Sequence, residues 1–474
     1  MIDKSELIKN YNRCAEGIEK WIGKNSYYHN TIEYLLKDMV LEESKVLFFN
    51  CSNGDLLCNV KPEYGAGVSI SPRMAEKAKD KHPEKNLHFL CLDIEENEIG
   101  EKTKFDYIVL NGTLGELADI QNVLKRISEY CNPDTRIIIL QYNPIWEMVL
   151  KIGEKLKLKM PEKISNWLSA EDIENFLTIT GYQVIRRDFY MLFPKRIPVL
   201  SFVLNRLAAK LPVINRFDLM QIVVARLLAP PENQKDLTAS VVITCRDEKE
   251  NIEPLVQRIP DMGKHTEIIF VEGHSTDGTR EEIQRVIKKY PEKDIVLLVQ
   301  DGFGQKDAII KGFDTAKGDF IMLLEADLTT PPEEIKKLWN VYENGYGEYV
   351  NGSRLIYRME KDSMPLINIL GNRFFGNIFT AMLGQRFTDT LCGFKAVSKK
   401  NYIKIKKVMK LWGDFDPFGD FELIFGAVKN NLKISEVPVK YKPRIYGETK
   451  TKPFKHGWQL MRITWLAFKR FVLI

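Results

Sequence analysis

In the sequence FIMLLEADLTTPPE, residues 320–333, two carboxylates directly follow a run of five apolar residues. Five consecutive apolar residues are typical of a strand in a parallel sheet, because such a strand is covered on both faces. Thr330 is expected to cap the helix that follows, with Glu333 as the reciprocal acceptor of a capping box. Glu325 and Asp327 would then lie in the crevice between strand end and helix start, where open α/β sheets bind ligands. Two carboxylates at this spacing can hold a divalent cation that in turn holds a diphosphate.

On its own, such a triplet of residues more often solvates a loop, but three further segments of the second half end in the same way. Apolar runs at 240–244, 267–271 and 295–299 each lead into a charged loop. The carboxyl ends of parallel strands share one edge of a sheet, so we expect the acids of these loops to meet Glu325 and Asp327. Only a cation or a network of hydrogen-bond donors could balance that negative charge. The acids concerned are Asp247, Glu272, Asp277 and Asp307.

Length and composition predict a globular chain of two or three domains. A chain of 474 residues is too long for one ordinary core, and its 44% hydrophobic and 28% charged content is not that of a disordered protein. The net charge of +5 is mild, but residues 440–474 hold nine Lys or Arg against the single acid Glu448. This excess points to an anionic partner, either a phosphorylated substrate or a membrane surface. Nothing in the composition points to nucleic acid.

The cysteines and the N-terminal residues favour a cytoplasmic setting. The seven cysteines form no CxxC pair, and the polar start of the chain does not look like a secretory signal. No apolar run reaches the length of about eighteen residues that a membrane-spanning helix needs. The apolar stretches 365–384 and 458–474 are each expected to be helices that either lie at a membrane surface or pack in a core.

The first half alternates strands and helices after a helical stretch over residues 1–44. Apolar strand candidates near residues 45, 64, 88, 105 and 136 predict a doubly wound α/β sheet. Residues 186–228 contain scattered prolines and are expected to be helices that close this domain. Residues 229–239 are polar and carry a double proline, as linkers do. The predicted organisation is one domain over 1–228, the linker 229–239, a second domain over 240–460 and an amphipathic C-terminal segment over 461–474.

Residues from about 40 to 190 resemble the class I S-adenosylmethionine-dependent methyltransferases, which implies a Rossmann fold. The resemblance is incomplete where the family binds its cofactor: Gly54 is retained in the first loop, with Asn50 and Ser52 where the family has glycines. Ser69 stands where the family places an acid for the ribose hydroxyls, while Asp93, at the adenine position, is retained. Losing a charge-assisted acceptor typically costs about 1.5 to 3 kcal/mol. S-adenosylmethionine is therefore a doubtful cofactor, and we expect a weakened or inactive methyltransferase.

Residues 238–460 resemble the family 2 glycosyltransferases of the nucleotide-diphospho-sugar transferase (GT-A) fold, especially the branch of dolichyl-phosphate mannose synthase. The family pattern D-A-D-x-x-x-P-P-E is matched by residues 325–333, with Glu325 where the family usually has Asp. Other matching segments are residues 240–248, 275–279, 304–308, 352–354, 389–394, 420–422 and 436–450. A methyltransferase-like domain ahead of such a transferase also resembles a known bacterial and archaeal fusion.

The resemblance implies a role for each matching residue. Asp247, Glu272 and Asp277 are expected to contact the base and ribose of a nucleotide-diphosphate sugar, and Lys306 and Asp307 to border the same pocket. Asp327, with Glu325, is expected to hold Mg²⁺ or Mn²⁺ against the diphosphate. The candidates to neutralise the leaving diphosphate or an acceptor phosphate are Arg354, Arg444 and Lys450.

The acceptor is left open between a polyprenyl phosphate and a glycan hydroxyl. An ionised phosphate needs no general base, whereas a hydroxyl does, and Asp420 is then the first candidate and Glu422 the second. We therefore interpret the chain as a metal-dependent inverting glycosyltransferase of the cytoplasm, either free there or at the inner face of the cell membrane. The alternatives are an active methyltransferase with a partner glycosyltransferase domain and a non-catalytic nucleotide-sugar-binding scaffold.

Overall fold

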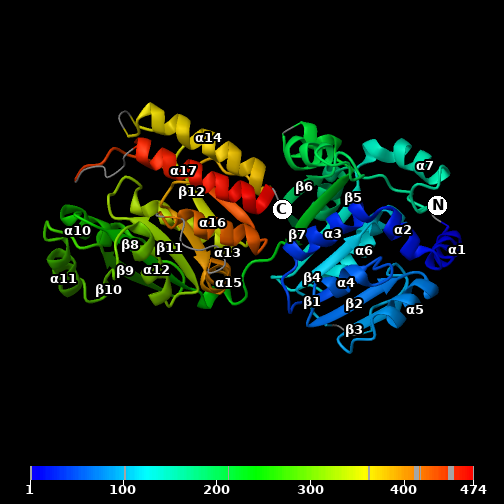
Figure 1. Ribbon diagram of the computed structural model, residues 1–474. Helices are drawn as coiled ribbons and strands as arrows, with labels where there is room; N and C mark the ends of the chain where they lie inside the picture. The colour runs from blue at the N-terminus through cyan, green and yellow to red at the C-terminus, as the bar shows by residue number, and fades with distance from the viewer. Residues whose placement is uncertain are drawn as a thin grey trace. The chain divides into compact units, whose positions relative to one another are not determined.

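The computed structural model describes residues 3–100, 103–211, 213–360, 363–409, 416, 418–446 and 453–472 of the chain. The chain divides into two compact units, Met1–Leu228 and Ala229–Ile474. Within the described residues, each unit is built on a mixed sheet of seven strands that carries helices on both faces (Figure 1). The two doubly wound α/β units expected from the sequence are therefore confirmed.

The first sheet has the strand order β3-β2-β1-β4-β5-β7-β6, and β7 is antiparallel to both of its neighbours. Its strands are β1 Lys45–Phe49, β2 Tyr64–Ser69, β3 Leu87–Cys91, β4 Tyr107–Asn111, β5 Arg136–Tyr142, β6 Tyr182–Tyr190 and β7 Met220–Leu227. The helices are α1 Lys4–Ala15, α2 Ile18–Lys24, α3 Ser26–Met39, α4 Asp55–Asn59, α5 Pro72–Lys81, α6 Ile120–Ser128, α7 Glu147–Lys155 and α8 Ala170–Ile179. Short turns of helix connect β6 to β7: α9 Leu200–Phe202, η3 Val203–Leu207, η4 Ala208–Lys210 and η5 Ile214–Phe217.

The expectation that residues 186–228 are helices holds only for the short helical turns between residues 200 and 217 and is wrong at both ends of the stretch. Residues 186–190 complete β6, and 220–227 form β7, which pairs with both β5 and β6. All but the last residue of β7 are buried. A strand covered on both faces shows no alternation of polar and apolar residues, so its pattern cannot be told from that of a buried helix.

The second sheet has the strand order β10-β9-β8-β11-β13-β12-β14, and β13 is antiparallel to both of its neighbours. Its strands are β8 Thr238–Cys245, β9 His265–Glu272, β10 Asp294–Val299, β11 Phe320–Glu325, β12 Tyr349–Ser353, β13 Lys395–Ser398 and β14 Ile434–Pro438. The helices are α10 Lys249–Arg258, α11 Thr279–Lys289, α12 Gln305–Thr315, α13 Ile335–Glu343, α14 Leu366–Leu383, α15 Lys399–Met409, α16 Asp420–Lys429 and α17 Pro453–Ala467.

Alternate residues of the central strands enter two different cores. Val241 and Ile243 of β8 lie in one apolar cluster, and Val242 between them lies in the other. The strands are therefore apolar throughout and turn polar only where they leave the sheet. Because Cys245 is in register with Glu272 and Thr244 with Glu325, the ends of β8, β9 and β11 lie side by side.

The helix start expected at Thr330 is wrong. The chain makes a short 3-10 turn at Pro332–Glu334, and α13 begins only at Ile335. Pro331 is extended, with φ −57° and ψ 131°, because the proline that follows it disfavours the helical region. Glu333 forms no capping box and instead accepts two hydrogen bonds from Arg258, at 2.7 and 2.8 Å.

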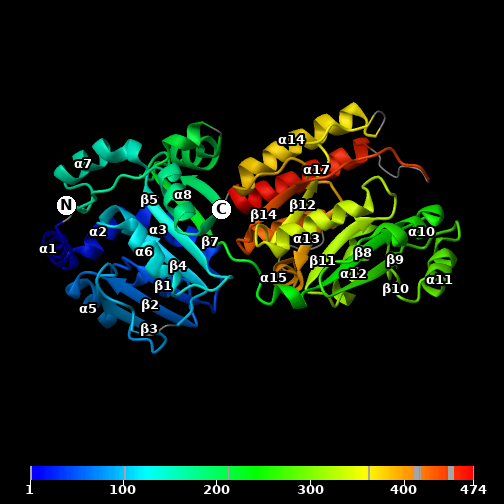
Figure 2. The same ribbon diagram turned by 180° about the vertical axis from the view of Figure 1, so that it is seen from behind.

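The boundary drawn at residue 460 does not separate two segments. Helix α17 runs continuously through it, and Leu460, Ile463 and Ala467 are all buried in the same apolar core. The apolar stretch 365–384 holds a single helix, α14 Leu366–Leu383, which packs against α17 (Figure 2). None of the helices in the described ranges is long and apolar enough to cross a bilayer.

Candidate functional site

The loops that follow β8 and β9 are joined by hydrogen bonds at the carboxyl edge of the second sheet. The Thr276 amide donates to Asp247 Oδ1 (2.8 Å), and the Asp247 amide donates to Ser275 Oγ (2.9 Å). The Lys249 amide donates to Asp277 Oδ2 (3.1 Å). The structure therefore brings Asp247 and Asp277 together, as the sequence pattern predicts.

Asp277, Glu272 and Asp307 each fix a loop of this edge. Burial disfavours the Asp277 carboxylate, but hydrogen bonds from Thr279, the Lys249 amide and Tyr446 outweigh it and lower the pKa of Asp277. Glu272 is buried and accepts from the Ser275 amide, and Asp307 Oδ2 accepts from the Gly302 amide at 2.9 Å. Asp277 is partly open to solvent, so its carboxylate remains accessible to a ligand at this edge.

Asp327 is the centre of a second group of charges at the same edge. Its Oδ1 accepts from the amide and the hydroxyl of Thr329, at 3.0 and 2.7 Å. Its Oδ2 accepts from Arg444 Nη2 at 2.7 Å, and Arg444 Nη1 donates to Glu248 Oε1 at 2.6 Å. Sequence reasoning did not assign a role to Glu248, which is buried; its position next to Asp247 was the available signal.

Glu325 is the last residue of β11, two residues before Asp327. Burial and repulsion from Asp327 raise the pKa of Glu325, while Gln305 Nε2 donates to its Oε1 at 2.7 Å. A Cβ on Gly393 would lie 2.5 Å from the Glu325 carboxyl carbon, so that loop position has no room for a side chain. Carboxylate oxygens are the ligands that Mg²⁺ and Mn²⁺ prefer, and a cation would relieve the repulsion between these two acids. The residues present therefore fit a divalent metal.

The two candidate general bases each face a lysine. Lys306 Nζ lies 2.7 Å from Glu422 Oε1, and Lys395 Nζ lies 3.4 Å from Asp420 Oδ1. Burial raises the pKa of Asp420 to about 7; Lys395 opposes this rise, and Asp416 and Glu325 add to it. Lys395 is fully buried, and its sequence context carries no signal that predicted it.

The acid Asp416 caps helix α16. Its Oδ2 accepts from the amides of Phe421 and Glu422, at 2.7 and 3.0 Å. It therefore orients the start of the helix that carries Asp420.

Arg354 is held in a buried ion pair. Its Nε and Nη2 donate to the two oxygens of Asp389, at 2.7 and 2.9 Å, and its guanidinium lies 5.2 Å from the centre of the Tyr441 ring. The Arg354 side chain is 11% exposed against 24% for Arg444, so Arg354 is less accessible to a diphosphate. Lys450, the third expected cation, lies outside the described residues.

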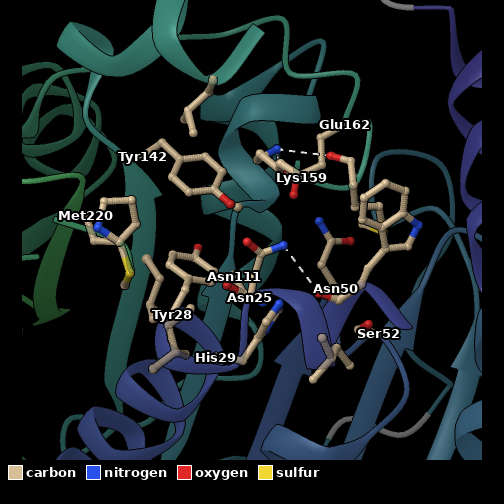
Figure 3. A pocket seen from close by; sticks show the side chains of 18 of the residues that line it. Asn25, Tyr28, His29, Asn50, Ser52, Asn111, Tyr142, Lys159, Glu162 and Met220 are labelled. Atoms are coloured by element: carbon tan, nitrogen blue, oxygen red, sulfur yellow. Dashed lines mark hydrogen bonds and ion pairs between the residues drawn. The ribbon is translucent and has the colours of Figure 1, made fainter. Parts of the chain in front are cut away.

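The first unit contains a cavity of about 440 Å³ at the carboxyl ends of β1, β4 and β5. In Figure 3, side chains from these strand ends and from helix α3 point into it. The rings of Tyr28 and Tyr142 are stacked, with centroids 5.9 Å apart, and Lys159 Nζ lies 5.1 Å from the Tyr142 centroid. Lys159 also pairs with Glu162 at 3.0 Å, and burial lowers the pKa of His29 to about 4. The lining is mainly apolar and aromatic, and it also includes two lysines, Lys159 and Lys195, and acids such as Glu116 and Glu162.

The positions at which the family binds S-adenosylmethionine are only partly retained in this unit. Gly54 keeps its left-handed backbone, with φ 86°, but Ser69 Oγ offers only one acceptor and receives the Ser71 amide at 3.1 Å. Asp93 is ion-paired with Lys4 at 3.3 Å. The space beside Asp93 is about 30 Å³, room for about two waters rather than a purine ring.

Comparison with known proteins identifies both units. Residues 240–405 match the model of the glycosyl transferase family 2, and residues 25–187 match that of a methyltransferase domain. The chain joins a methyltransferase domain to a family 2 glycosyltransferase domain.

Two curated relatives match the glycosyltransferase domain. The dolichol-phosphate mannosyltransferase of Pyrococcus furiosus is 30% identical over 238 residues, which cover 48% of this chain and 64% of the relative. The undecaprenyl-phosphate 4-deoxy-4-formamido-L-arabinose transferase of Edwardsiella ictaluri is 28% identical over 215 residues, 44% of this chain and 62% of the relative. The chain thus spans less than two thirds of the length of either.

Solved structures match each domain in turn. Glucosyl-3-phosphoglycerate synthase from Mycobacterium tuberculosis has 17% identity and a TM-score of 0.36, over 50% of this chain and 80% of that one. A magnesium protoporphyrin IX methyltransferase from Synechocystis has 16% identity and a TM-score of 0.32, over 48% of this chain and 100% of that one.

Proposed function

We propose that the glycosyltransferase domain transfers a sugar, with inversion, from a nucleotide-diphosphate sugar bound through Mg²⁺ or Mn²⁺ at Asp327 and Glu325. The observation that carries this proposal is the meeting of acids from the loops after β8, β9 and β11 at one edge of the sheet. At that edge, Arg444 ties Asp327 to the loop of Asp247 through Glu248.

In this proposal each charged group has one task. Asp247 and Asp277 accept hydrogen bonds from the base and ribose. Asp327 and Glu325 would hold the metal, which would supply positive charge against the diphosphate. Arg444 already faces Asp327, and turning from that carboxylate onto the leaving phosphate would stabilise the charge that develops there. Lys306 borders the same edge through its pair with Glu422.

We propose a polyprenyl phosphate as the acceptor, because the names of both curated relatives specify a polyprenyl-phosphate substrate. Its phosphate is already ionised, so no residue must remove a proton. Helices α14 and α17 expose Leu366, Ile367 and Trp458, at 70%, 64% and 69%, and would place the domain at the inner face of the cell membrane.

The direct test is incubation of the full chain with a panel of nucleotide-diphosphate sugars, Mn²⁺ and a short polyprenyl phosphate. We expect one sugar donor to release nucleoside diphosphate, with the sugar recovered on the lipid phosphate. If nucleoside diphosphate is released in the presence of a glycan acceptor and no lipid product forms, the acceptor belongs instead to the hydroxyl class. No release from any donor would favour the non-catalytic scaffold.

Asp420→Asn distinguishes the two acceptor classes. The pKa of Asp420 is raised to about 7, so the carboxylate that a general base needs is present above that pH and is lost as the pH falls below it. With a polyprenyl phosphate we expect the variant to stay within about tenfold of the wild-type rate, with the same pH profile. A loss of rate of about 10²- to 10⁴-fold, together with the loss of a rising limb near neutral pH in the pH–rate profile, would show that Asp420 is a general base for a hydroxyl acceptor.

We further propose that the methyltransferase domain does not bind S-adenosylmethionine. Position 69 is a serine where the family has an acid, and Asp93 is already paired with Lys4. Both observations support this assignment. Titration calorimetry of the full chain with S-adenosylmethionine is expected to give no binding heat. The same titration with Ser69→Asp controls for a site that lacks only its ribose acceptor. Micromolar binding by the wild type would contradict the proposal.

A further inference from the structure

Exposed apolar side chains of the first unit gather in two segments. Among its described residues, the large hydrophobic side chains that are exposed all lie in 145–158 and 197–217, apart from Tyr34, Ile179 and Leu228. Met148 and Val199 are each 77% exposed, although a surface helix or turn normally turns such residues inward. Helix α7 has no buried residue at all. Soluble monomers rarely expose contiguous apolar surface of this extent.

Hydrogen bonds join these two segments into one surface. Trp146 Nε1 donates to the Phe217 carbonyl at 2.8 Å, and Asn143 Nδ2 donates to the Arg216 carbonyl at 2.8 Å. In both views, α7 and the short helical turns between β6 and β7 lie along the same side of this unit (Figure 1, Figure 2). We call the described residues of 145–158, 195–211 and 213–217 the α7 surface.

The α7 surface is also strongly basic. Its sequence holds eight Lys or Arg and two Glu, a surplus of six positive charges against +5 for the whole chain. Both acids are already paired: Glu147 with Lys151, and Glu154 with Lys159 at 3.1 Å. Residues 195–217 contain no acid. Aliphatic side chains interleaved with cations are the pattern that binds at the interface of an anionic bilayer.

We propose that the α7 surface binds anionic membranes, with its aliphatic side chains among the outer acyl carbons and its cations against the lipid phosphates. The charge surplus favours a lipid surface over a protein partner, because headgroup phosphates supply a continuous negative layer to both segments at once. This contact belongs to the methyltransferase domain and is independent of the sugar-transfer proposal. It gives that domain a function that needs no S-adenosylmethionine.

The test is flotation of the full chain with vesicles of phosphatidylcholine alone and with vesicles that also contain phosphatidylglycerol. We expect binding to the anionic vesicles and weakening of that binding by salt. Met148→Asp with Val199→Asp is expected to lower the bound fraction at least about tenfold, because each change removes an inserted apolar side chain. Ile179→Asp is the matched control: it is an exposed residue of α8 outside the surface, 52% exposed, and should change nothing.

A second pair of changes separates this surface from α14. If Leu366→Asp with Ile367→Asp abolishes binding while Met148→Asp with Val199→Asp leaves it intact, the membrane contact lies in the glycosyltransferase domain and the proposal fails. It also fails if the chain ignores anionic vesicles and elutes as a dimer that Met148→Asp with Val199→Asp dissociates. Unchanged flotation with a lowered melting temperature would mean that the surface packs against the rest of the chain. That outcome too would overturn it.

Discussion

Asp327→Asn is expected to lower nucleoside diphosphate release by about 10² to 10³-fold. The substitution keeps the shape of the side chain and an oxygen that can accept from Thr329, but it removes the charge that a divalent cation needs. In the folded protein, that charge is balanced by Arg444 at 2.7 Å. Removing it would weaken the proposed metal site and free Arg444 to pair with Glu248 alone. Steady-state release at saturating donor, with Mn²⁺ titrated, measures the loss.

Asp319→Asn is the matched control, because it makes the same change one residue before the same strand, at the opposite edge of the sheet. Asp319 Oδ2 accepts from the Thr238 amide at 2.9 Å, a contact remote from the proposed donor site. We expect this variant to keep wild-type turnover. If both variants lose activity equally, the effect is one of folding. If release survives Asp327→Asn, the metal assignment is wrong even though the family assignment of the domain stands.

The sequence predicted the edge of the second sheet well because each signal there was local. An uninterrupted apolar run identifies a doubly covered strand, and a carboxylate just after it must lie at the edge where neighbouring strands also end. Asp247, Asp277 and Asp327 could therefore be placed together before any side chain was seen. The helix start at Thr330 was mispredicted for a local reason as well, since Pro332 fixes an extended residue before it.

The partners that set the charges of the site could not be predicted in the same way. Arg444 and Asp327 are 117 residues apart in the chain, and Lys395 meets Asp420 through a strand whose sequence gives no hint of a buried cation. The α7 surface escaped prediction for a different reason. An aliphatic residue at helical spacing has the same pattern whether it faces a core or water, so exposure appears only when the fold is known.

Asp389→Ala is expected to destabilise the glycosyltransferase domain by about 3 to 5 kcal/mol. Asp389 is fully buried, and it accepts from Nε and Nη2 of Arg354, whose side chain is only 11% exposed. Truncation leaves that guanidinium buried without a counter-charge, and the cost of an unpaired buried charge exceeds the value of the pair itself. Denaturant unfolding, followed by probes in each domain, should show that the unfolding transition of the glycosyltransferase domain shifts while that of the methyltransferase domain stays in place.

The pair of Asp236 and Lys264 provides the control for that measurement. Its side chains are 70% and 66% exposed, so Asp236→Ala should cost less than about 1 kcal/mol.

The pH dependence of the stability that Asp389 contributes has a definite sign. Burial raises the pKa of Asp389, but Arg354 outweighs burial and the net pKa is lowered. The stability that Asp389 contributes is therefore present above the carboxyl's unfolded pKa of about 3.9 and is lost as the pH falls through the lower folded value. A loss below about 1 kcal/mol on Asp389→Ala would mean that Arg354 turns to another acid. Glu325 is a candidate, because Arg354 opposes the rise in the pKa of that carboxyl.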